Sequence, residues 1–408
     1  MVYGRDSDAT DAGQLSGRHS LSRSGSATNL DDVFDDPAHG DVGRDRLGVH
    51  FAWEGVLLLG AVVLAYLLYA NYRDVVTGAA LKDLLVLGSV LGMLALGAAI
   101  TLRVAAPNLA LGSIAMASAL YYAKHGGDNI ITSSITPIAV AMGLGVGIAI
   151  LVVGFHVPGW AASLVAMLVT IAWIKNQFPS SISVNGVFDP SNRAYYLFGA
   201  FAVLSVVAGL LGLIKPIRRG VGRFRPIADP ALRRGGLAAT VTALGLVLSS
   251  GLAATAGIIM ATMLDSAGKP VDPSEGIELT ALAVGAALVG GVSAFGRRGG
   301  VFGTILGTVL IVLLMTYGDR AGWRISEFVL AAGALTTGLI VTRLVETFGR
   351  PLELGGPEDW SDVGVGATTT WSTTSTSDDP WSGLSSAPSS PPPTTTTTTQ
   401  WGDTDRWR

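Results

Sequence analysis

Glu278–Ala294 reads ELTALAVGAALVGGVSA and Val301–Leu314 reads VFGTILGTVLIVLL, and the sequence FGRRGG at 295–300 joins these two apolar segments. Glycine and alanine recur where a helix that faces only lipid would more readily carry leucine and isoleucine. Small side chains let membrane helices approach closely, which promotes their association where lipid offers no hydrophobic gain. The upstream segment Ser249–Ala261, SSGLAATAGIIMA, has the same character. Together these segments predict closely packed membrane helices.

The glycines of this region are spaced for helix packing. Three of them, Gly299, Gly303 and Gly307, recur every four residues and would share one face of a helix. A second interpretation, ordinary glycine without a special contact, remains open because glycine is common in spanning helices. The expected helix-packing positions are Gly290, Gly291, Gly299, Gly303 and Gly307.

Composition places the chain among integral membrane proteins. Its 408 residues include 53 glycines and no cysteine, only 14% of them are charged, and the mean hydropathy is +0.50. These values lie outside the usual range of soluble domains. The absence of cysteine excludes disulfides and thiolate metal sites. The net charge of -3 gives no support for nucleic acid as a partner.

Two polar tails flank the apolar middle of the chain. Residues 1–50 are rich in Asp, Ser, Gly and Arg, and residues 349–408 are rich in Thr, Ser and Pro. Neither composition can bury a core, so we expect both tails to be disordered. The first apolar stretch begins only at Phe51, which favours a cytoplasmic tail and a retained helix over a cleaved signal peptide. The expected transmembrane domain is therefore 51–348.

Ten apolar windows lie between the tails, and a helix needs about 20 residues to cross the hydrocarbon of a bilayer. Helices are the natural assignment because every backbone polar group must be paired inside lipid. We therefore expect an all-α, polytopic membrane protein with about ten transmembrane helices. The windows are 51–70, 82–104, 108–123, 135–154, 158–175, 195–214, 238–262, 278–295, 301–318 and 325–345.

The distribution of Lys and Arg predicts the orientation in the membrane. Short loops rich in these residues stay in the cytoplasm. The loop after the sixth window is the richest in them, and counting windows outward from it places both tails in the cytoplasm. We expect a multi-pass protein of the plasma membrane. The basic residues of this loop are Lys215, Arg218, Arg219, Arg223, Arg225, Arg233 and Arg234.

The second and third windows form a nearly continuous apolar stretch that is interrupted by AAPN at Ala105–Asn108. Proline lacks an N–H donor and clashes with the preceding helical turn, so we expect a broken helix. Irregular backbone at membrane depth is tolerated only against protein or a wet cavity, which makes this break a candidate part of a permeation path. Asn108 would cap the third helix, line the path, or do both. Arg103, one turn earlier, is expected to snorkel to the cytoplasmic surface.

Three segments carry a resemblance to a known family. Gly276–Ala283 (GIELTALA) and Leu288–Thr304 (LVGGVSAFGRRGGVFGT) match the pattern GxELxAIAA followed by LGGxSLxGGxGxxxGT. Gly92–Ser113 can be laid without gaps on AVGMTLVILTxGIDLSVGS, with Asn108 at the acidic position of that pattern. In these segments the chain resembles the membrane permease subunits of the ribose and simple-sugar branch of ABC importers.

The same family resemblance implies a substrate path. The sequence HVPGWAASLVAM at His156–Met167 is similar to the family's RVPxFIxTLxxM, which lies at a short cytoplasmic turn. His156 itself is interpreted as a solvated turn residue rather than a proton relay. The pathway residues that the resemblance implies are Asn108, Gly112, Ser113, Trp160 and Ser163.

A cytoplasmic coupling loop also follows from the resemblance. GRFRPIADPALRRGG at Gly222–Gly236 occupies the position of the family's ATPase-docking loop, GRxIYAxGGNxEAARLSGI, but it lacks the acidic and alanine-rich core. Asp229 and Pro230 could cap and start one helical turn there. A simpler interpretation makes this loop a topological anchor only. The expected coupling residues are Arg223, Asp229, Leu232, Arg233 and Arg234.

Membership in this family would imply several partners besides the lipid bilayer. They are a second permease subunit, two cytoplasmic ABC ATPase subunits and an extracytoplasmic solute-binding protein. The chain itself lacks a phosphate-binding loop, because its one Gly-Lys pair, Gly268-Lys269, is followed by Pro270. It also lacks H-E-x-x-H and G-x-S-x-G, so we expect a transport subunit without a cofactor or metal rather than an enzyme.

Three alternatives stay open. A branched-chain amino-acid or urea-type ABC permease would share the architecture and differ only in its solute. An ion-coupled secondary transporter would take up its solute without an ATPase subunit. A membrane scaffold would depend on the tail at 350–408 and tolerate substitutions at Asn108.

Overall fold

The computed structural model describes residues 47–349, apart from 128, 185–187, 213, 215–216, 218–220, 222–235 and 297–298. Most of the two expected tails, 1–46 and 350–408, lies outside the described residues. The α-helices are α2 (Leu47–Asn71), α3 (Gly78–Arg103), α4 (Leu111–His125), α5 (Ile130–Ala149), α6 (Gly159–Gln177), α7 (Ala194–Leu211), α9 (Gly236–Ser266), α10 (Ile277–Val289), α11 (Gly303–Arg320) and α12 (Glu327–Gly349). Between the helices, an isolated antiparallel bridge joins Ile182 to Val271.

The predicted all-α class is confirmed, and a helix lies in each of the ten windows. The number of spans is corrected. Within the described part of the chain, eight helices are long and apolar enough to cross a membrane. The other two, α4 and α10, have only 15 and 13 residues, which is short of the roughly 20 that crossing requires. For α10 the reason is that apolar composition continues beyond Val289, where the helix ends. For α4 the window itself, 108–123, is shorter than a span requires.

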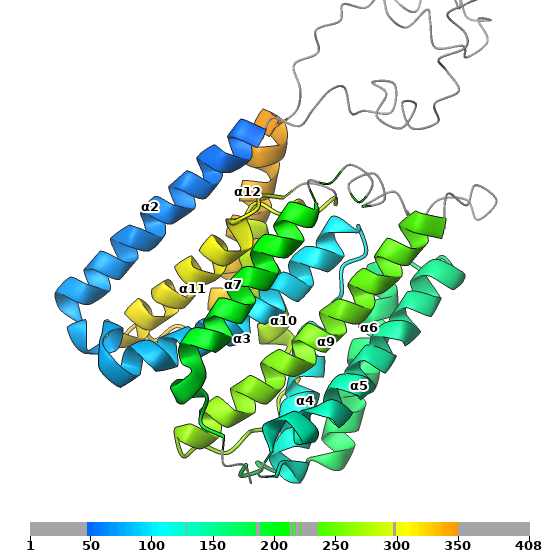
Figure 1. The fold of residues 1–408 in the computed structure, drawn as a ribbon, viewed down its shortest axis with the longest axis horizontal. Coiled ribbons are helices and arrows are strands. Elements are labelled where there is room, and N and C mark those ends of the chain that lie inside the picture. The colour runs from blue at the N-terminus through cyan, green and yellow to red at the C-terminus, as the bar shows by residue number, and fades with distance from the viewer. Residues whose placement is uncertain are drawn as a thin grey trace, which may run out of the picture. The chain divides into compact units, whose positions relative to one another are not determined.

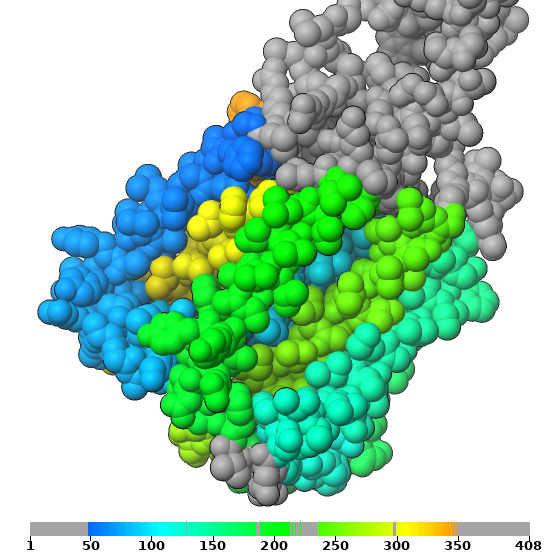
Figure 2. Space-filling view, viewed as in Figure 1, coloured from blue at the N-terminus to red at the C-terminus, as the bar shows by residue number. Residues whose placement is uncertain are grey.

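Helices α3 and α9 form the centre of the bundle. In the most apolar window of each helix, 78% of the residues are buried in α3 and 61% in α9. The corresponding share is 22% in α2 and in the segment that contains α7. The short helices pack on this centre, α4 on α9 and α10 on α3. Figure 1 shows α7 and α9 between α2 at one edge and α5 and α6 at the other, and Figure 2 shows the same order on the surface of that face.

Glycines permit these helices to touch through their backbones. A Cβ added to Gly257 of α9 would overlap the carbonyl group of Ala115 in α4. A Cβ on Gly303 of α11 would overlap the carbonyl oxygen of Gly290, and one on Gly307 would come within 2.5 Å of the carbonyl oxygen of Ala286. The α4–α9 and α10–α11 contacts therefore depend on the absence of a side chain.

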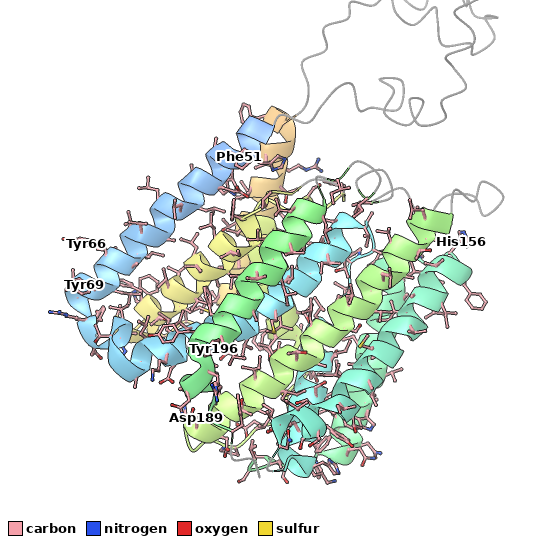
Figure 3. The ribbon with its side chains drawn as sticks, in the orientation of Figure 1. Phe51, Tyr66, Tyr69, His156, Asp189 and Tyr196 are labelled. Carbon is pink, nitrogen blue, oxygen red and sulfur yellow. The ribbon has the colours of Figure 1, made fainter. Side chains whose placement is uncertain are left out.

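Large apolar and aromatic side chains cover the outside of the bundle. On α2, Phe51, Tyr66 and Tyr69 are 54%, 67% and 48% exposed. Figure 3 shows Tyr66 and Tyr69 directed away from the other helices. A continuous apolar exterior of this kind is suited to lipid, and it agrees with the eight spans in placing the chain in a membrane as a multi-pass protein.

Candidate functional site

The first helix break, residues 104–110, separates α3 from α4. The break begins with a left-handed turn, in which Ala105 has φ 57°. The Ala105 N–H donates to Leu102 O at 2.9 Å and the Ala106 N–H donates to Thr101 O at 3.0 Å, which together satisfy the last carbonyls of α3. Pro107 follows and cannot donate, so the chain leaves the helix here as its sequence predicts.

Asn108 faces the inside of the bundle. Its side chain is 1% exposed, and its Nδ2 donates to Ser249 Oγ at 3.0 Å and to Ser250 Oγ at 3.4 Å on α9. Its Oδ1 accepts from the Ala110 N–H at 3.0 Å. The N-cap of α4 is Ala110, so Asn108 stabilises the turn before the helix rather than serving as the helix cap. The structure thus joins the broken backbone to the polar pair on α9.

Ser163 and Ser113 approach the same break from other helices. Ser163 on α6 is fully buried and its Oγ donates to Pro107 O at 3.0 Å and to Gly159 O at 2.8 Å. Ser113 on α4 is also fully buried, and its Oγ donates to Ala110 O at 3.0 Å. With Asn108, these residues surround the first break with uncharged hydrogen-bonding groups.

The other two expected pathway residues lie differently. Trp160 is 54% exposed on the outer side of α6. Gly112 lies in a backbone contact, because a Cβ there would overlap the carbonyl oxygen of Gly276, and its N–H donates to Thr280 Oγ1 at 2.9 Å. The structure therefore brings together Asn108, Ser113 and Ser163, while Gly112 lies at the contact between the starts of α4 and α10.

The second helix break, residues 290–302, separates α10 from α11. It begins in the same way as the first one, with Gly291 at φ 81°. The Gly291 N–H donates to Leu288 O at 2.9 Å and the Val292 N–H donates to Ala287 O at 3.1 Å. Helix α11 starts only at Gly303, so Gly299 lies in the break and not on a helical face with Gly303 and Gly307. The expectation of three glycines on one helix is corrected because the break delays the start of the helix.

A buried acid on α2 contacts the second break, and the sequence analysis did not single it out. Glu54 is 6% exposed, and its Oε1 accepts from the Phe302 N–H at 2.7 Å and from the Gly303 N–H at 2.9 Å. The neighbouring Trp53 donates from Nε1 to Val289 O at 2.8 Å. The available signal was an acidic residue inside the first apolar window, since such residues are rare in spanning helices and seldom face lipid.

Arg103 does not snorkel to the surface as expected. Its Nη2 donates to Gly300 O at 2.6 Å, and its Nε is buried without a hydrogen-bond partner in the part of the chain that the structure describes. A Cβ on Gly299 would meet the guanidinium at about 3 Å. The second break offers a carbonyl at close range, and this contact replaces the solvation that snorkelling would have provided.

The remaining sequence-based positions lie away from the first break or outside the described residues. His156 is at the turn after the π-helical end of α5, Ile150–Gly154, with φ 58°. Glu278 lies in the first turn of α10 and accepts from Ser274 Oγ at 3.2 Å. Among the residues searched, no group of three metal-ligating side chains occurs. The expected coupling residues lie outside the described part of the chain, namely Arg223, Asp229, Leu232, Arg233 and Arg234.

The chemistry of the first break suits recognition of a neutral solute. Its side chains are hydroxyls and one amide, which can donate and accept hydrogen bonds but cannot act as an ion pair or an acid-base couple at neutral pH. Asn108, Ser163, Ser249 and Ser250 are all 1% exposed or less, so the cluster is closed in this conformation. A solute could reach these groups only after the surrounding helices separate.

Comparison with known proteins identifies a relative. No family model matches the chain, and no solved structure matches it with significance. The autoinducer 2 import system permease protein LsrC of Enterobacter sp. (strain 638) is 28% identical over 271 residues, which are 62% of this chain and 75% of that protein. By its name, the relative is a transport component of an import system and not an enzyme.

Proposed function

We propose that this chain is a permease subunit of the simple-sugar ABC importer family and that it carries a monosaccharide or similar small polar solute, using ATP hydrolysed by a separate subunit. It is a transport subunit and not an enzyme. The observation that supports the choice of solute is the buried, uncharged cluster at the first break. Asn108 of the first break and Ser249 of the central helix α9 are hydrogen-bonded at 3.0 Å through their side chains.

Burying an uncharged polar group costs free energy unless the group finds a hydrogen-bond partner, whereas an apolar side chain has no such requirement. At the first break the partners are other side chains and broken backbone, and both become available if the helices move apart. A solute rich in hydroxyl groups could then replace these internal hydrogen bonds one for one. Asn108, Ser113 and Ser163 would contact the solute, and Trp160 would lie at the rim.

We propose the partners on the basis of family membership. They are a second permease subunit, cytoplasmic ABC ATPase subunits and an extracytoplasmic solute-binding protein. The ATPases would dock on the loop between α7 and α9, which contains Arg223 and Asp229 in the sequence. Closure of the ATPases would separate the helices at the first break and expose the polar cluster.

The proposed orientation places both tails in the cytoplasm of the cell and the chain in the plasma membrane. Figure 1 shows the start of α2, the end of α7, the start of α9 and the end of α12 at one end of the bundle. The basic loop joins α7 to α9, so the positive-inside rule applies to that end. This arrangement supports the orientation.

An ATP-driven importer is favoured over the alternatives because the relative belongs to a named import system. No observation favours an ion-coupled carrier, a branched-chain amino-acid or urea permease, or a scaffold. The first two differ from the proposal in their energy source or in their solute, and both differences can be measured.

The test is purification of the tagged chain from native membranes, followed by reconstitution in liposomes. We expect a P-loop ATPase subunit to co-purify in a fixed ratio, and uptake of a labelled monosaccharide to require ATP. Deleting 350–408 serves as the control for a scaffold role and should leave uptake intact. Uptake that follows an ion gradient without an ATPase subunit would contradict the proposal and identify a secondary carrier.

A further inference from the structure

Helix α2 contacts both ends of the second break through two adjacent side chains. Trp53 bonds to Val289 O, where α10 ends, at 2.8 Å. Glu54 accepts from the N–H groups of Phe302 and Gly303, where α11 starts, at 2.7 and 2.9 Å. Because few residues of α2 are buried elsewhere, this pair fixes the helix to the bundle at a specific place.

Arg103 contacts the same turn from the opposite side. It is the last residue of α3 and therefore adjoins the first break. Its Nη2 donates to Gly300 O at 2.6 Å, while a Cβ on Gly300 would overlap the Glu54 carboxylate. Glu54 and Arg103 share no direct ion pair, and both approach the backbone of Gly300. Gly300 lies between the two charges and separates them without a side chain of its own.

The two breaks also touch through their backbones. Gly296 has φ 93°. A Cβ added to Gly296 would lie 3.0 Å from the Cβ of Ala105 and 3.3 Å from the carbonyl oxygen of Arg103. Both residues of this contact have left-handed backbones, at φ 93° and 57°. The second break is thus held against the first, and the polar cluster of Asn108 begins three residues beyond Ala105.

Burial makes each of these charges depend on the backbone of the second break and on the opposite charge beyond it. A carboxylate in lipid is costly unless it is bonded, and here the N–H groups at the start of α11 and the positive helix end stabilise it. Removing one member of a buried charge pair leaves the other uncompensated, whereas replacing both by neutral groups is often tolerated. The pair therefore predicts a specific pattern in single and double variants.

We propose that Glu54 and Arg103 are positioning residues that hold the two helix breaks together, so that both open and close as one unit during transport. The role in transport rests on the proposed function. The positioning itself does not, because it can be measured in the reconstituted chain without solute or ATPase.

The experiment uses the absence of cysteine from this chain. Single cysteines replace Ala106 in the first break or Val292 in the second, both of which are fully buried. In the reconstituted full chain we expect Glu54→Gln and Arg103→Met each to speed labelling by a water-soluble maleimide at least about tenfold at both positions. The double variant should return both rates to within about threefold of the parent, since no uncompensated charge remains.

A cysteine at Ala253, fully buried in the apolar core on α9, reports whether a variant is folded. It should stay protected in every variant. If Glu54→Gln exposes it, Glu54→Asp takes its place as the single variant only, because a shorter carboxylate keeps the charge and loses the contact. Any of three results would overturn the proposal. They are faster labelling at position 292 alone, unchanged labelling at both positions, and a double variant that reacts as fast as the single variants.

Transport kinetics separate positioning from solute recognition. In a transporting preparation, Glu54→Gln should lower the maximal uptake rate at least about tenfold while KM changes less than about twofold, because the pair does not contact the solute. A rise in KM with an unchanged maximal rate would overturn the proposed role. If no uptake of any solute is found, the labelling pattern still decides whether the breaks move together.

Discussion

Replacing Gly303 with valine should prevent stable folding of the membrane domain. A Cβ at this position overlaps the carbonyl oxygen of Gly290, and a Cβ on Gly290 comes within 2.5 Å of the Gly303 carbonyl oxygen, so neither backbone can yield without separating α10 from α11. Overpacking typically costs 1–3 kcal/mol and occasionally more, and here we expect about 3 kcal/mol or more because backbone meets backbone. The measurement is the thermal unfolding temperature and the monodisperse fraction of the detergent-purified protein.

Gly143→Val is the matched control for this substitution. Gly143 is also a helical glycine, on α5, but beyond the adjoining backbone of its own helix no atom of the described residues lies within 4 Å of a Cβ added there. The control should unfold near the temperature of the parent protein. If Gly303→Val were as stable as Gly143→Val, the contact between the two helices would be looser than the structure describes.

Replacing Asn108 with leucine should lower transport, while the protein still folds. Leucine has a similar size but cannot hydrogen-bond a solute or Ser249. The two serines keep their own bonds to Leu246 O, at 2.8 and 3.0 Å, so neither hydroxyl donor is stranded. The Ala110 N–H loses Asn108 Oδ1 as its acceptor, so we also expect the variant to be less stable by about 1–3 kcal/mol. Each hydrogen bond to the passing solute that is lost is worth about 0.5–1.5 kcal/mol, so we expect uptake to fall about two- to tenfold for each bond. The measurement is the initial rate of solute uptake into liposomes that contain the reconstituted transporter and ATP.

Ser89→Ala is the control for the loss of a buried polar group. Ser89 is fully buried in α3, but its Oγ bonds only to Leu85 O in its own helix, at 2.7 Å. The variant should transport at nearly the parent rate. Equal rates for the Asn108 and Ser89 variants would contradict a solute path at the first break.

The sequence predicted the fold class and the first break from local chemistry. Long apolar windows require helices in lipid, and Pro107 removes a donor at a known position, so neither inference needs information about distant residues. The count of spans was less accurate because a composition window does not detect a turn such as that at Gly291, where the helix ends inside apolar sequence. Left-handed residues follow the ends of α3 and α10, namely Ala105 and Gly291, and composition does not reveal them.

The contacts of the two charged residues could not be predicted from the sequence. Glu54 meets Phe302 across a separation of 248 residues, and Arg103 meets Gly300 across 197. Snorkelling was a reasonable expectation for an arginine at the end of a helix, but it assumes that no nearer acceptor exists. Only the position of the second break against the end of α3 shows that one does. Trp160 and Ser163 were likewise grouped by resemblance, and burial separates them.

The most direct test of a solute path at the first break is labelling of a single cysteine in place of Ser249 by a water-soluble maleimide. Ser249 is fully buried and bonded to Asn108, while Ala253, one turn further along α9, is equally buried in apolar packing and provides the control. We expect Cys at 249 to be protected at rest and to react when ATP drives transport, with the 253 position protected throughout. Continued protection at 249 during active uptake would contradict a path through the first break.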